Sequence, residues 1–390
     1  MAVQLKAARV AAVPDIAAQL DLASACINGA ESVMARDAVA PAAAARAPLV
    51  VIGHRGKGMN ALASPDERLR EVKENSIRSF NEAARVAGVG YVEFDVQVTK
   101  DGCPVIFHDD FIFTEQDGKI SEQRMTDLRL DEFLSYGPQK DQAKVGRPLL
   151  RKLKDGRIIG WDVRSDDAFC TLREAFEDVD ARVGFNVELK FDDDLVYQEE
   201  ELTGVLHAIL KVVFEHAKDR PVIFSSFQPD AALLMRKLQD QYPVYFLTNG
   251  GTQIYADARR NSLEEAVRLC RAGGLQGIVS EARAVFRHPS AVAMVKEAGL
   301  SLLTYGTLNN VPEAVYMQHL IGLDGVIVDL VQEITDAVSE FAAVVAPVPG
   351  HEDGQVGRLE LDRAAPAKTT PYFSQREISF LLRLIPELVQ

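Results

Sequence analysis

The sequence predicts an α/β protein that folds as a (β/α)8 TIM barrel with an insertion after the second strand. From Leu49 onward, short β-branched or apolar runs alternate with amphipathic segments of helical length, which is typical of strand–helix units on a parallel sheet. Eight such runs lie between residues 49 and 329, and eight strand–helix units make a barrel. A doubly wound open sheet is the alternative, but no G-x-G-x-x-G motif follows the first run.

The predicted strands are rich in β-branched and aromatic residues, which pack well on a pleated sheet. They are residues 49–52, 91–98, 184–189, 221–226, 243–248, 276–280, 300–305 and 325–329. The predicted helices between them include residues 75–86, 233–239, 262–272 and 312–320.

The longest gap between predicted strands, residues 111–183, is too long for an ordinary loop. We therefore expect a folded insertion there, near a functional face. Within it, residues 140–157 carry seven basic and two acidic side chains. This basic stretch is either a solvated loop or a collar that attracts an anionic substrate.

The two ends of the chain differ in texture from the predicted barrel domain at residues 48–345. Residues 1–47 are Ala-rich, and we expect a disordered extension or, alternatively, a transit peptide. Residues 346–390 begin as a linker and end in a short helix that starts with a capping box at Ser374 and Glu377. We expect that helix to dock on the barrel, with a weak membrane-surface or partner contact as the alternative.

Composition and charge exclude several classes of protein. The formal net charge is −14, which argues against a nucleic-acid binder because phosphate contacts need a basic face. No run approaches 18 apolar residues, so no transmembrane segment is predicted. The scattered cysteines, none at C-x-x-C spacing, indicate neither a disulfide framework nor a zinc site.

Candidate catalytic residues follow from the rule that barrel active sites lie at the carboxyl ends of the strands. The first strand leads into GHRG (53–56), which presents His54 beside Arg55. In the second strand, alternation puts Glu93 and Asp95 together on the inner face. Two buried carboxylates need a positive partner, either a divalent cation or an internal Arg or Lys.

The next segments add further polar groups to the same rim. The third strand brings Glu188 to its carboxyl end, with Lys190 in phase two residues later. After the second strand, a tight turn and a short return strand lead to His108 and Asp109. Two histidines, three acids, an arginine and a lysine are the groups needed for metal-assisted acid/base hydrolysis of a phosphodiester. The sequence contains no G-x-S-x-G motif, so no covalent serine nucleophile is indicated.

Taken together, these motifs resemble the glycerophosphodiester phosphodiesterase family, over about residues 49–340. The segments that carry the resemblance are GHRG (53–56), ENSIRSF (74–80), EFDVQVTKDGCPVIFHDD (93–110), NVELK (186–190) and SSFQP (225–229). Segments similar to the plant members are FLTNGGT (246–252), GGLQGIVSE (273–281), LTYGTLNNVPEAVYMQ (303–318) and the tail FLLRLIPELVQ.

The resemblance implies an enzyme that cleaves glycerophosphodiesters to sn-glycerol 3-phosphate and an alcohol such as choline or ethanolamine, with Mg²⁺ or alternatively Ca²⁺. The matching positions are His54 and His108 for the catalytic histidines, Glu93, Asp95 and Glu188 for the metal ligands, and Arg55, Glu74, Lys190 and Tyr305 for substrate binding. We expect His54 to act as base and His108 as acid. A glycerol hydroxyl or water could be the nucleophile.

Two departures from the family pattern concern substrate contacts. KENS (73–76) stands where PENT is common, and Tyr305 stands where Trp is frequent. A lysophospholipase D acting on membrane lysophospholipids and a non-catalytic binding barrel are the alternative functions. The plant-like resemblance favours a plastid location, with the cytoplasm as the alternative.

Overall fold

The computed structural model describes residues 49–193 and 195–344. The expectations for residues 1–47 and for the linker and helix at residues 346–390 lie outside this part of the chain.

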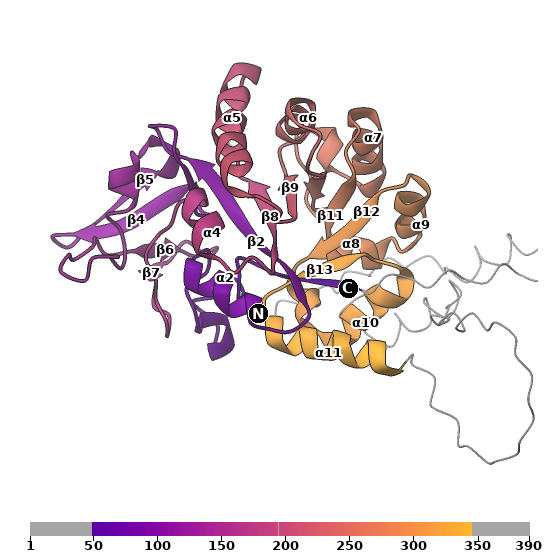
Figure 1. Ribbon diagram of the computed structural model, residues 1–390, viewed down its shortest axis with the longest axis horizontal. Coiled ribbons are helices and arrows are strands. Elements are labelled where there is room, and N and C mark those ends of the chain that lie inside the picture. Colours follow the sequence, from indigo (N-terminus) through magenta and orange to yellow (C-terminus); the bar gives the residue numbers. More distant parts are fainter. Residues whose placement is uncertain (1–48, 194, 345–390) are drawn as a thin grey trace, which may run out of the picture. The chain divides into compact units, whose positions relative to one another are not determined.

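Eight parallel strands close into a barrel, as the sequence predicts (Figure 1). β1 (Val50–Gly53) pairs with β2 (Val89–Val98) on one side and with β13 (Gly325–Val328) on the other, which closes the sheet. The remaining barrel strands are β8 (Gly184–Leu189), β9 (Val222–Ser226), β10 (Val244–Thr248), β11 (Gly277–Glu281) and β12 (Ser301–Tyr305). Every predicted strand overlaps one of these eight, so the predicted (β/α)8 fold is confirmed.

Helices follow the strands around the barrel (Figure 1). The four predicted helices overlap α2 (Ile77–Ala84), α6 (Pro229–Leu238), α7 (Leu263–Gly273) and α10 (Pro312–Ile321). The other α-helices are α3 (Leu130–Phe133), α4 (Leu172–Asp178), α5 (Glu199–His216), α8 (Ala282–Arg287), α9 (Ser290–Glu297) and α11 (Val331–Val344). Short 3₁₀ turns are η1 (Glu67–Arg70), η2 (Met125–Asp127), η3 (Ala258–Arg260) and η4 (Thr307–Asn310).

Helix α6 begins four residues before its predicted start. Pro229 occupies its first turn, where a fixed φ and a missing N–H are tolerated. The side chain of Gln228 accepts a hydrogen bond from the backbone N–H of Asp230 and caps the helix.

The alternation of β2 sorts its side chains between two environments. Val92, Phe94 and Val96 belong to the large core between the sheet and the helices, whereas Glu93 and Asp95 point into the barrel. Below them a separate apolar cluster fills the barrel interior, formed by Ile52, Ile223, Tyr245, Leu247, Val279, Leu303 and Ile327. The carboxylates therefore lie above a packed apolar floor.

The insertion after the second barrel strand is a small antiparallel sheet, seen at the left of Figure 1. The short β3 (Pro104–Ile106) first pairs with β2, and the sheet then follows in the order β5-β4-β6-β7. Its strands are β4 (Phe111–Gln116), β5 (Lys119–Arg124), β6 (Leu150–Lys152) and β7 (Ile158–Gly160). Its core includes Phe107, next to His108, so the packing of the insertion positions that histidine.

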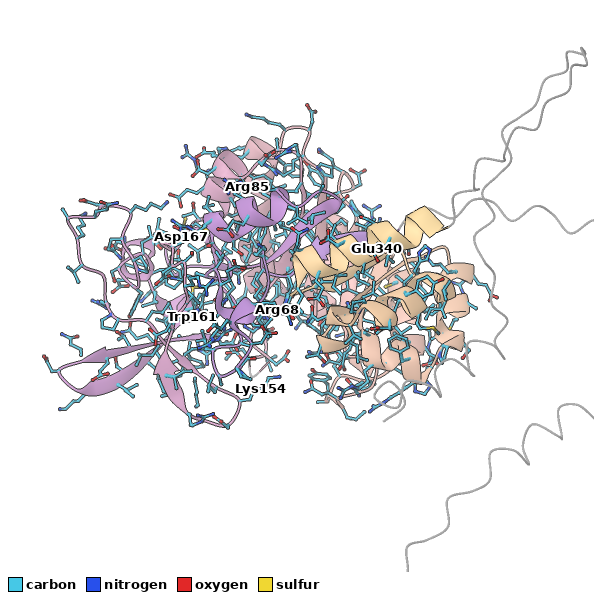
Figure 2. The ribbon with its side chains drawn as sticks, turned by 90° about the horizontal axis from the view of Figure 1, so that it is seen from below. Arg68, Arg85, Lys154, Trp161, Asp167 and Glu340 are labelled. Carbon is cyan, nitrogen blue, oxygen red and sulfur yellow. The ribbon has the colours of Figure 1, made fainter. Side chains whose placement is uncertain are left out.

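The basic stretch 140–157 does not form a continuous charged surface. Lys140 pairs with Glu174, and Arg157 pairs with Asp155. Arg151, on β6, pairs with Glu74 and has a side chain that is only 11% exposed. Lys154, labelled in Figure 2, is the member of this stretch that lines the cavity at the mouth of the barrel.

Among the residues described, no helix has the length and apolar character needed to cross a membrane.

Candidate active site

A cavity of about 680 Å³ lies at the carboxyl ends of the barrel strands. Seven of the nine predicted site residues line it, namely His54, Arg55, Glu93, His108, Glu188, Lys190 and Tyr305. The other two, Glu74 and Asp95, are buried immediately behind this wall and contact Arg55. The residues selected at the strand ends are therefore brought together.

Glu93, Asp95 and Glu188 form a compact carboxylate cluster. One oxygen from each lies within 4.8 Å of the others. Asp95 and Glu188 are direct partners in the parallel pairing of β2 with β8, and Glu93 lies two residues earlier on the same face of β2. The strand register therefore sets the spacing of the three acids.

The cluster has the properties of a divalent-cation site. Burial, reinforced by Asp95, raises the pKa of Glu93 to about 8, and burial also raises the pKa of Glu188. The Oε1 atom of Glu93 is buried without a hydrogen-bond partner. A partnerless carboxylate oxygen among other acids is costly unless a cation compensates it, and Mg²⁺ and Ca²⁺ prefer oxygen ligands.

Arg55 and Lys190 bring positive charge to the same cluster. The guanidinium Nε of Arg55 lies 3.3 Å from Asp95 Oδ2, and its backbone N–H donates to Glu93 Oε2 at 2.9 Å. Lys190 Nζ lies 3.1 Å from Glu188 Oε1 and 3.9 Å from Asp95 Oδ1. Burial opposes the charge on Lys190, but Glu188 outweighs it and raises the pKa to about 12.

A tight turn after β1 gives Arg55 its orientation. Arg55 has a φ of +51°, and Gly56 has a φ of +93°. A Cβ atom at Gly53 would lie 2.1 Å from the carbonyl oxygen of Gly56, so no other residue fits at that position. The two glycines of GHRG let the backbone N–H and the side chain of Arg55 reach two different carboxylates.

His54 is held by Asp329, a residue that the sequence reasoning did not select. His54 Nδ1 lies 2.7 Å from Asp329 Oδ1, and His54 Nε2 lies 3.9 Å from Glu93 Oε2. Burial opposes protonation of His54, but the Asp329 carboxylate outweighs it and raises the pKa. Asp329 ends the predicted strand 325–329, so the strand-end rule could have found it.

His108 is held in the same manner by its neighbour. Its Nδ1 atom lies 2.7 Å from Asp109 Oδ1, and its side chain is 33% exposed toward the cavity. Burial and the positive charges of Arg55 and Lys190 keep the pKa of His108 well below its usual value. Each histidine thus turns one ring nitrogen to a carboxylate and leaves the other available.

Glu74 lies behind Arg55 and does not line the cavity. Its Oε1 atom accepts a 2.7 Å hydrogen bond from Arg55 Nη1, and its Oε2 atom accepts from Arg151 and from the backbone of Asn60. Burial would raise the pKa of Glu74, but Arg151 and Arg55 outweigh it and lower the pKa to about 2. Arg151 was missed because no pattern in the basic stretch singles it out.

Aromatic and polar residues from β9 to β12 and their loops line the rest of the cavity. The Tyr305 hydroxyl donates to Asn249, and its ring meets Phe227 edge to face at 5.9 Å. Arg260 forms a paired contact with Asp193 and lies over the ring of Tyr255. This wall can accommodate the organic part of a substrate.

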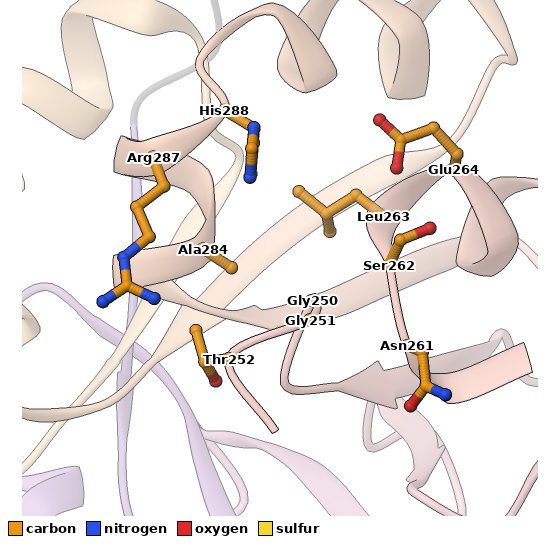
Figure 3. Close-up of a pocket in the computed structure, with 10 residues that line it drawn as sticks. All are labelled: Gly250, Gly251, Thr252, Asn261, Ser262, Leu263, Glu264, Ala284, Arg287 and His288. Atoms are coloured by element: carbon orange, nitrogen blue, oxygen red, sulfur yellow. The ribbon is translucent and has the colours of Figure 1, made fainter. Parts of the chain in front are cut away.

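A second, smaller cavity of about 190 Å³ lies between the Gly250–Gly251 turn, the start of α7 and the end of α8 (Figure 3). None of the predicted site residues lines it.

Comparison with known proteins agrees with this geometry. The model of the glycerophosphoryl diester phosphodiesterase family matches residues 54–333. The Arabidopsis thaliana glycerophosphodiester phosphodiesterase GDPD2 is 58% identical over 340 residues, which cover 87% of this chain and 89% of that protein. The Arabidopsis protein named glycerophosphodiester phosphodiesterase GDPD1, chloroplastic, is 57% identical over 87% of this chain and 90% of its own length.

Solved structures share the fold. An Oleispira antarctica phosphodiesterase in complex with the product sn-glycerol-3-phosphate matches with a TM-score of 0.52 and 22% identity, over 75% of this chain and 97% of that one. A glycerophosphodiester phosphodiesterase from Parabacteroides distasonis matches with a TM-score of 0.51 and 21% identity, over 76% of this chain and 99% of that one.

Proposed function

The chain belongs to the glycerophosphoryl diester phosphodiesterase family, and from this premise we propose that it hydrolyses glycerophosphodiesters to sn-glycerol 3-phosphate and an alcohol by metal-assisted acid/base catalysis. The observation that carries this mechanism is the cavity itself. It combines two histidines, each hydrogen-bonded to a carboxylate, with a cluster of three acids and with the positively charged side chains of Arg55 and Lys190.

The cofactor in this proposal is a divalent cation, Mg²⁺ or alternatively Ca²⁺, held by Glu93, Asp95 and Glu188. When bound, such a cation neutralises charge on the phosphate and its oxygen nucleophile. The partnerless oxygen of Glu93 and the 4.8 Å spacing of the ligand oxygens support the assignment.

In this mechanism Arg55 and Lys190 bind the nonbridging oxygens of the phosphodiester, because both line the cavity beside the acid cluster. Glu74 acts on the substrate through Arg55, since its carboxylate holds the guanidinium from behind. Tyr305 contributes to the site for the organic part of the substrate, together with Phe227.

His54 and His108 exchange protons with the nucleophile and the leaving alcohol. We assign His54 as the base and His108 as the acid. In the metal-free protein the pKa of His54 is raised and that of His108 is lowered, which is the opposite of what these roles need. A cation held by Glu93 would lower the pKa of His54, and the anionic phosphodiester would raise that of His108. In both rings Nδ1 faces a carboxylate, so Nε2 is the atom that acts on the substrate. Because one carboxylate orients each ring, neither histidine needs to reorient during the reaction.

Choline and ethanolamine esters are the proposed substrates in glycerophospholipid breakdown. A fungal relative from Candida albicans, named glycerophosphocholine phosphodiesterase, is 34% identical over 74% of this chain and 28% of its own length. The aromatic wall around Tyr305 and Phe227 suits the organic end of such substrates.

One observation favours the second candidate function, a lysophospholipase D. Ile254 and Val196 are 78% and 88% exposed, and each lies close in the chain to a cavity-lining residue, Tyr255 and Asp193 respectively. Exposed apolar side chains so close in the chain to cavity-lining residues are suited to contact the surface of a membrane that carries the substrate.

The decisive experiment is a substrate panel assayed for release of sn-glycerol 3-phosphate with Mg²⁺, Ca²⁺ or EDTA. We expect metal-dependent release from glycerophosphocholine or glycerophosphoethanolamine. Lysophosphatidylcholine is assayed instead for choline and lysophosphatidic acid, because its cleavage by a lysophospholipase D releases no sn-glycerol 3-phosphate. Release of these products only, and only with vesicles, would support the second candidate. No release from any substrate with either metal would refute the hydrolytic function.

We also propose a plastid location, since one close Arabidopsis relative is named chloroplastic. A reporter fused to residues 1–60 should enter plastids, and a cytoplasmic distribution would contradict this.

A further inference from the structure

Arg151 is a buried arginine that the insertion contributes to the rear of the site. It lies on β6, and its side chain is 11% exposed. Its guanidinium lies 4.4 Å from the ring centroid of Trp161. Trp161, labelled in Figure 2, in turn donates from Nε1 to the side chain of Asn60, so the guanidinium has a fixed support.

The two ends of the Arg151 guanidinium bind two different carboxylates. Nη1 donates to Glu74 Oε2 at 3.1 Å, and Nη2 donates to Asp109 Oδ1 at 3.1 Å. Nη1 also lies 3.3 Å from the carbonyl oxygen of Asn60. A planar guanidinium suits this bridging geometry, whereas an ammonium group offers a single point of charge.

Each of these carboxylates holds a residue of the proposed catalytic machinery. Glu74 uses its other oxygen to accept from Arg55 at 2.7 Å. Asp109 uses the same Oδ1 atom for Arg151 and for His108 Nδ1, at 3.1 and 2.7 Å. A continuous chain of contacts therefore runs from Arg55 through Arg151 to His108, across four separate segments of the sequence.

We propose that Arg151 is a positioning residue for hydrolysis, acting through Asp109 on His108 and through Glu74 on Arg55. The inference rests on the proposed function, because it concerns the residues assigned there to acid catalysis and phosphate binding. With Asp109 fixed by Arg151, Nδ1–H of His108 keeps its acceptor and the ring keeps its orientation, so that Nε2 faces the substrate and carries the proton that the acid donates. Without Arg151, the Asp109 carboxylate would keep its hydrogen bond to His108 but lose the guanidinium that fixes it, and both side chains could shift together.

The test compares Arg151→Met and Arg151→Lys with the wild type, using release of sn-glycerol 3-phosphate from the best substrate of the panel. A displacement of about 1 Å at a catalytic group can cost about 10²-fold in rate. We expect Arg151→Met to lower kcat by about 10- to 100-fold, with a smaller change in KM. Arg151→Lys should recover only part of this loss, because one ammonium cannot bridge both carboxylates.

Arg220 offers a matched control elsewhere in the barrel. It is also buried and lies 4.1 Å from the ring centroid of Phe185. Within the part of the chain that the structure describes, its guanidinium donates to backbone carbonyls alone, those of Val179, Asp180 and Val183. Arg220→Lys should lower the unfolding midpoint and leave kcat of the folded protein near the wild-type value. If Arg151 had only a structural role, Arg151→Lys would behave in the same manner.

A double-mutant cycle combines the Arg151 substitution with Asp109→Asn. If Arg151→Met folds poorly, Arg151→Lys takes its place in the cycle. If Arg151 acts through Asp109, the effect of its substitution on kcat becomes smaller in the Asp109→Asn background. Independent, multiplicative effects, or single variants within about twofold of wild-type kcat, would overturn the proposal. An inactive wild type would instead overturn the hydrolytic function itself.

Discussion

His54 Nδ1 lies 2.7 Å from Asp329 Oδ1, across the seam where β1 meets β13. Gly53 and Val328 are partners in that pairing, so the residues that follow them, His54 and Asp329, lie side by side. Asp329 is fixed in turn by the backbone N–H of Met59 at 3.0 Å and by Asn310 Nδ2 at 2.8 Å. Its pKa falls to about 2 because His54 and these donors outweigh burial, so the carboxylate is ionised and Nδ1 of His54 carries the proton.

Asp329→Asn should therefore impair catalysis without disrupting the fold. Loss of an orienting carboxylate removes the preference for one tautomer, and we expect kcat to fall between about 10- and 10⁴-fold. The pKa of His54 should also fall, because the charge that raises it is gone. Steady-state kinetics and an NMR titration of the histidine ring in metal-free protein measure the two effects.

Asp324→Asn is the control for this prediction, because Asp324 immediately precedes the same strand β13. Its carboxylate pairs with Lys296 and accepts from the backbone N–H of Leu302 at 2.6 Å. The substitution should reduce stability and leave kcat and the His54 titration unchanged. Wild-type kinetics in Asp329→Asn would contradict the positioning role of that residue.

Substitution of the histidines should separate the acid from the base. We expect His54→Ala and His108→Ala each to lower kcat for glycerophosphocholine by at least about 10². A substrate with a p-nitrophenol leaving group needs little protonation, so it should reduce the defect of His108→Ala far more than that of His54→Ala. Kinetics on both substrates measure the difference.

His207→Ala is the control for the histidine variants, because His207 is exposed on α5. It should have wild-type activity on both substrates. If the p-nitrophenyl substrate rescued His54→Ala instead, the two roles would be reversed. Near-normal activity in both active-site variants would exclude acid/base catalysis by these residues.

Much of the fold and site follows from local rules, because strand periodicity fixes which side chains face the barrel interior. Glu93, Asp95 and Glu188 could be grouped from alternation and strand ends alone. Helix α5 could also have been predicted, since its buried residues Leu202, Leu206, Ile209, Leu210 and Val213 recur at helical spacing.

Arg151 could not be placed from the sequence, and Glu74 could be selected only through the family resemblance. Arg151 reaches the site because an antiparallel sheet, which is paired over long distances in the chain, packs behind the barrel rim. Glu74 lies in an irregular segment before α2, so no periodicity sets the direction of its side chain. Such contacts depend on tertiary packing, which a local pattern does not encode.

Metal binding should stabilise the folded protein, and Glu93 should be required for the full effect. A ligand present at a hundred times its Kd adds about 2.7 kcal/mol to the free energy of unfolding. We expect Mg²⁺ or Ca²⁺ to raise the Tm of the wild type much more than that of Glu93→Gln, because a neutral amide lacks the negative charge of the carboxylate. Glu115→Gln, at an exposed position on β4, should retain the full shift. An equal shift in Glu93→Gln would exclude this cluster as the binding site.

The affinity for the metal should rise with pH up to about 8. Burial and Asp95 raise the pKa of Glu93 to about 8, so this carboxyl is protonated at neutral pH in the metal-free protein. Metal ligands must be deprotonated, so binding below this pH releases a proton. Calorimetry in two buffers of different ionisation enthalpy should detect about one proton released near pH 6.5 and almost none near pH 9. A metal affinity that does not change with pH would contradict this prediction.

The ion pairs of Glu74 should make stability depend on pH in the acidic range. The pKa of Glu74 is about 2 in the folded protein against 4.5 ordinarily, because Arg151 and Arg55 outweigh its burial. Because the pKa of Glu74 is lower in the folded than in the unfolded protein, its ionised carboxylate stabilises the fold fully above about pH 4.5. This contribution is lost as the pH falls toward 2 and the carboxylate is protonated. The difference corresponds to roughly 3 kcal/mol.

Glu74→Gln should therefore unfold more easily than the wild type by roughly 3 kcal/mol at pH 7, and the gap should close between pH 4.5 and 2. Urea unfolding in EDTA across this range measures the gap while keeping metal binding out of the comparison. Glu122→Gln, an exposed position on β5, should follow the wild type at every pH. If the difference in unfolding free energy between Glu74→Gln and the wild type did not change with pH, the lost stability would come from packing, because only the charge of Glu74 makes this difference depend on pH.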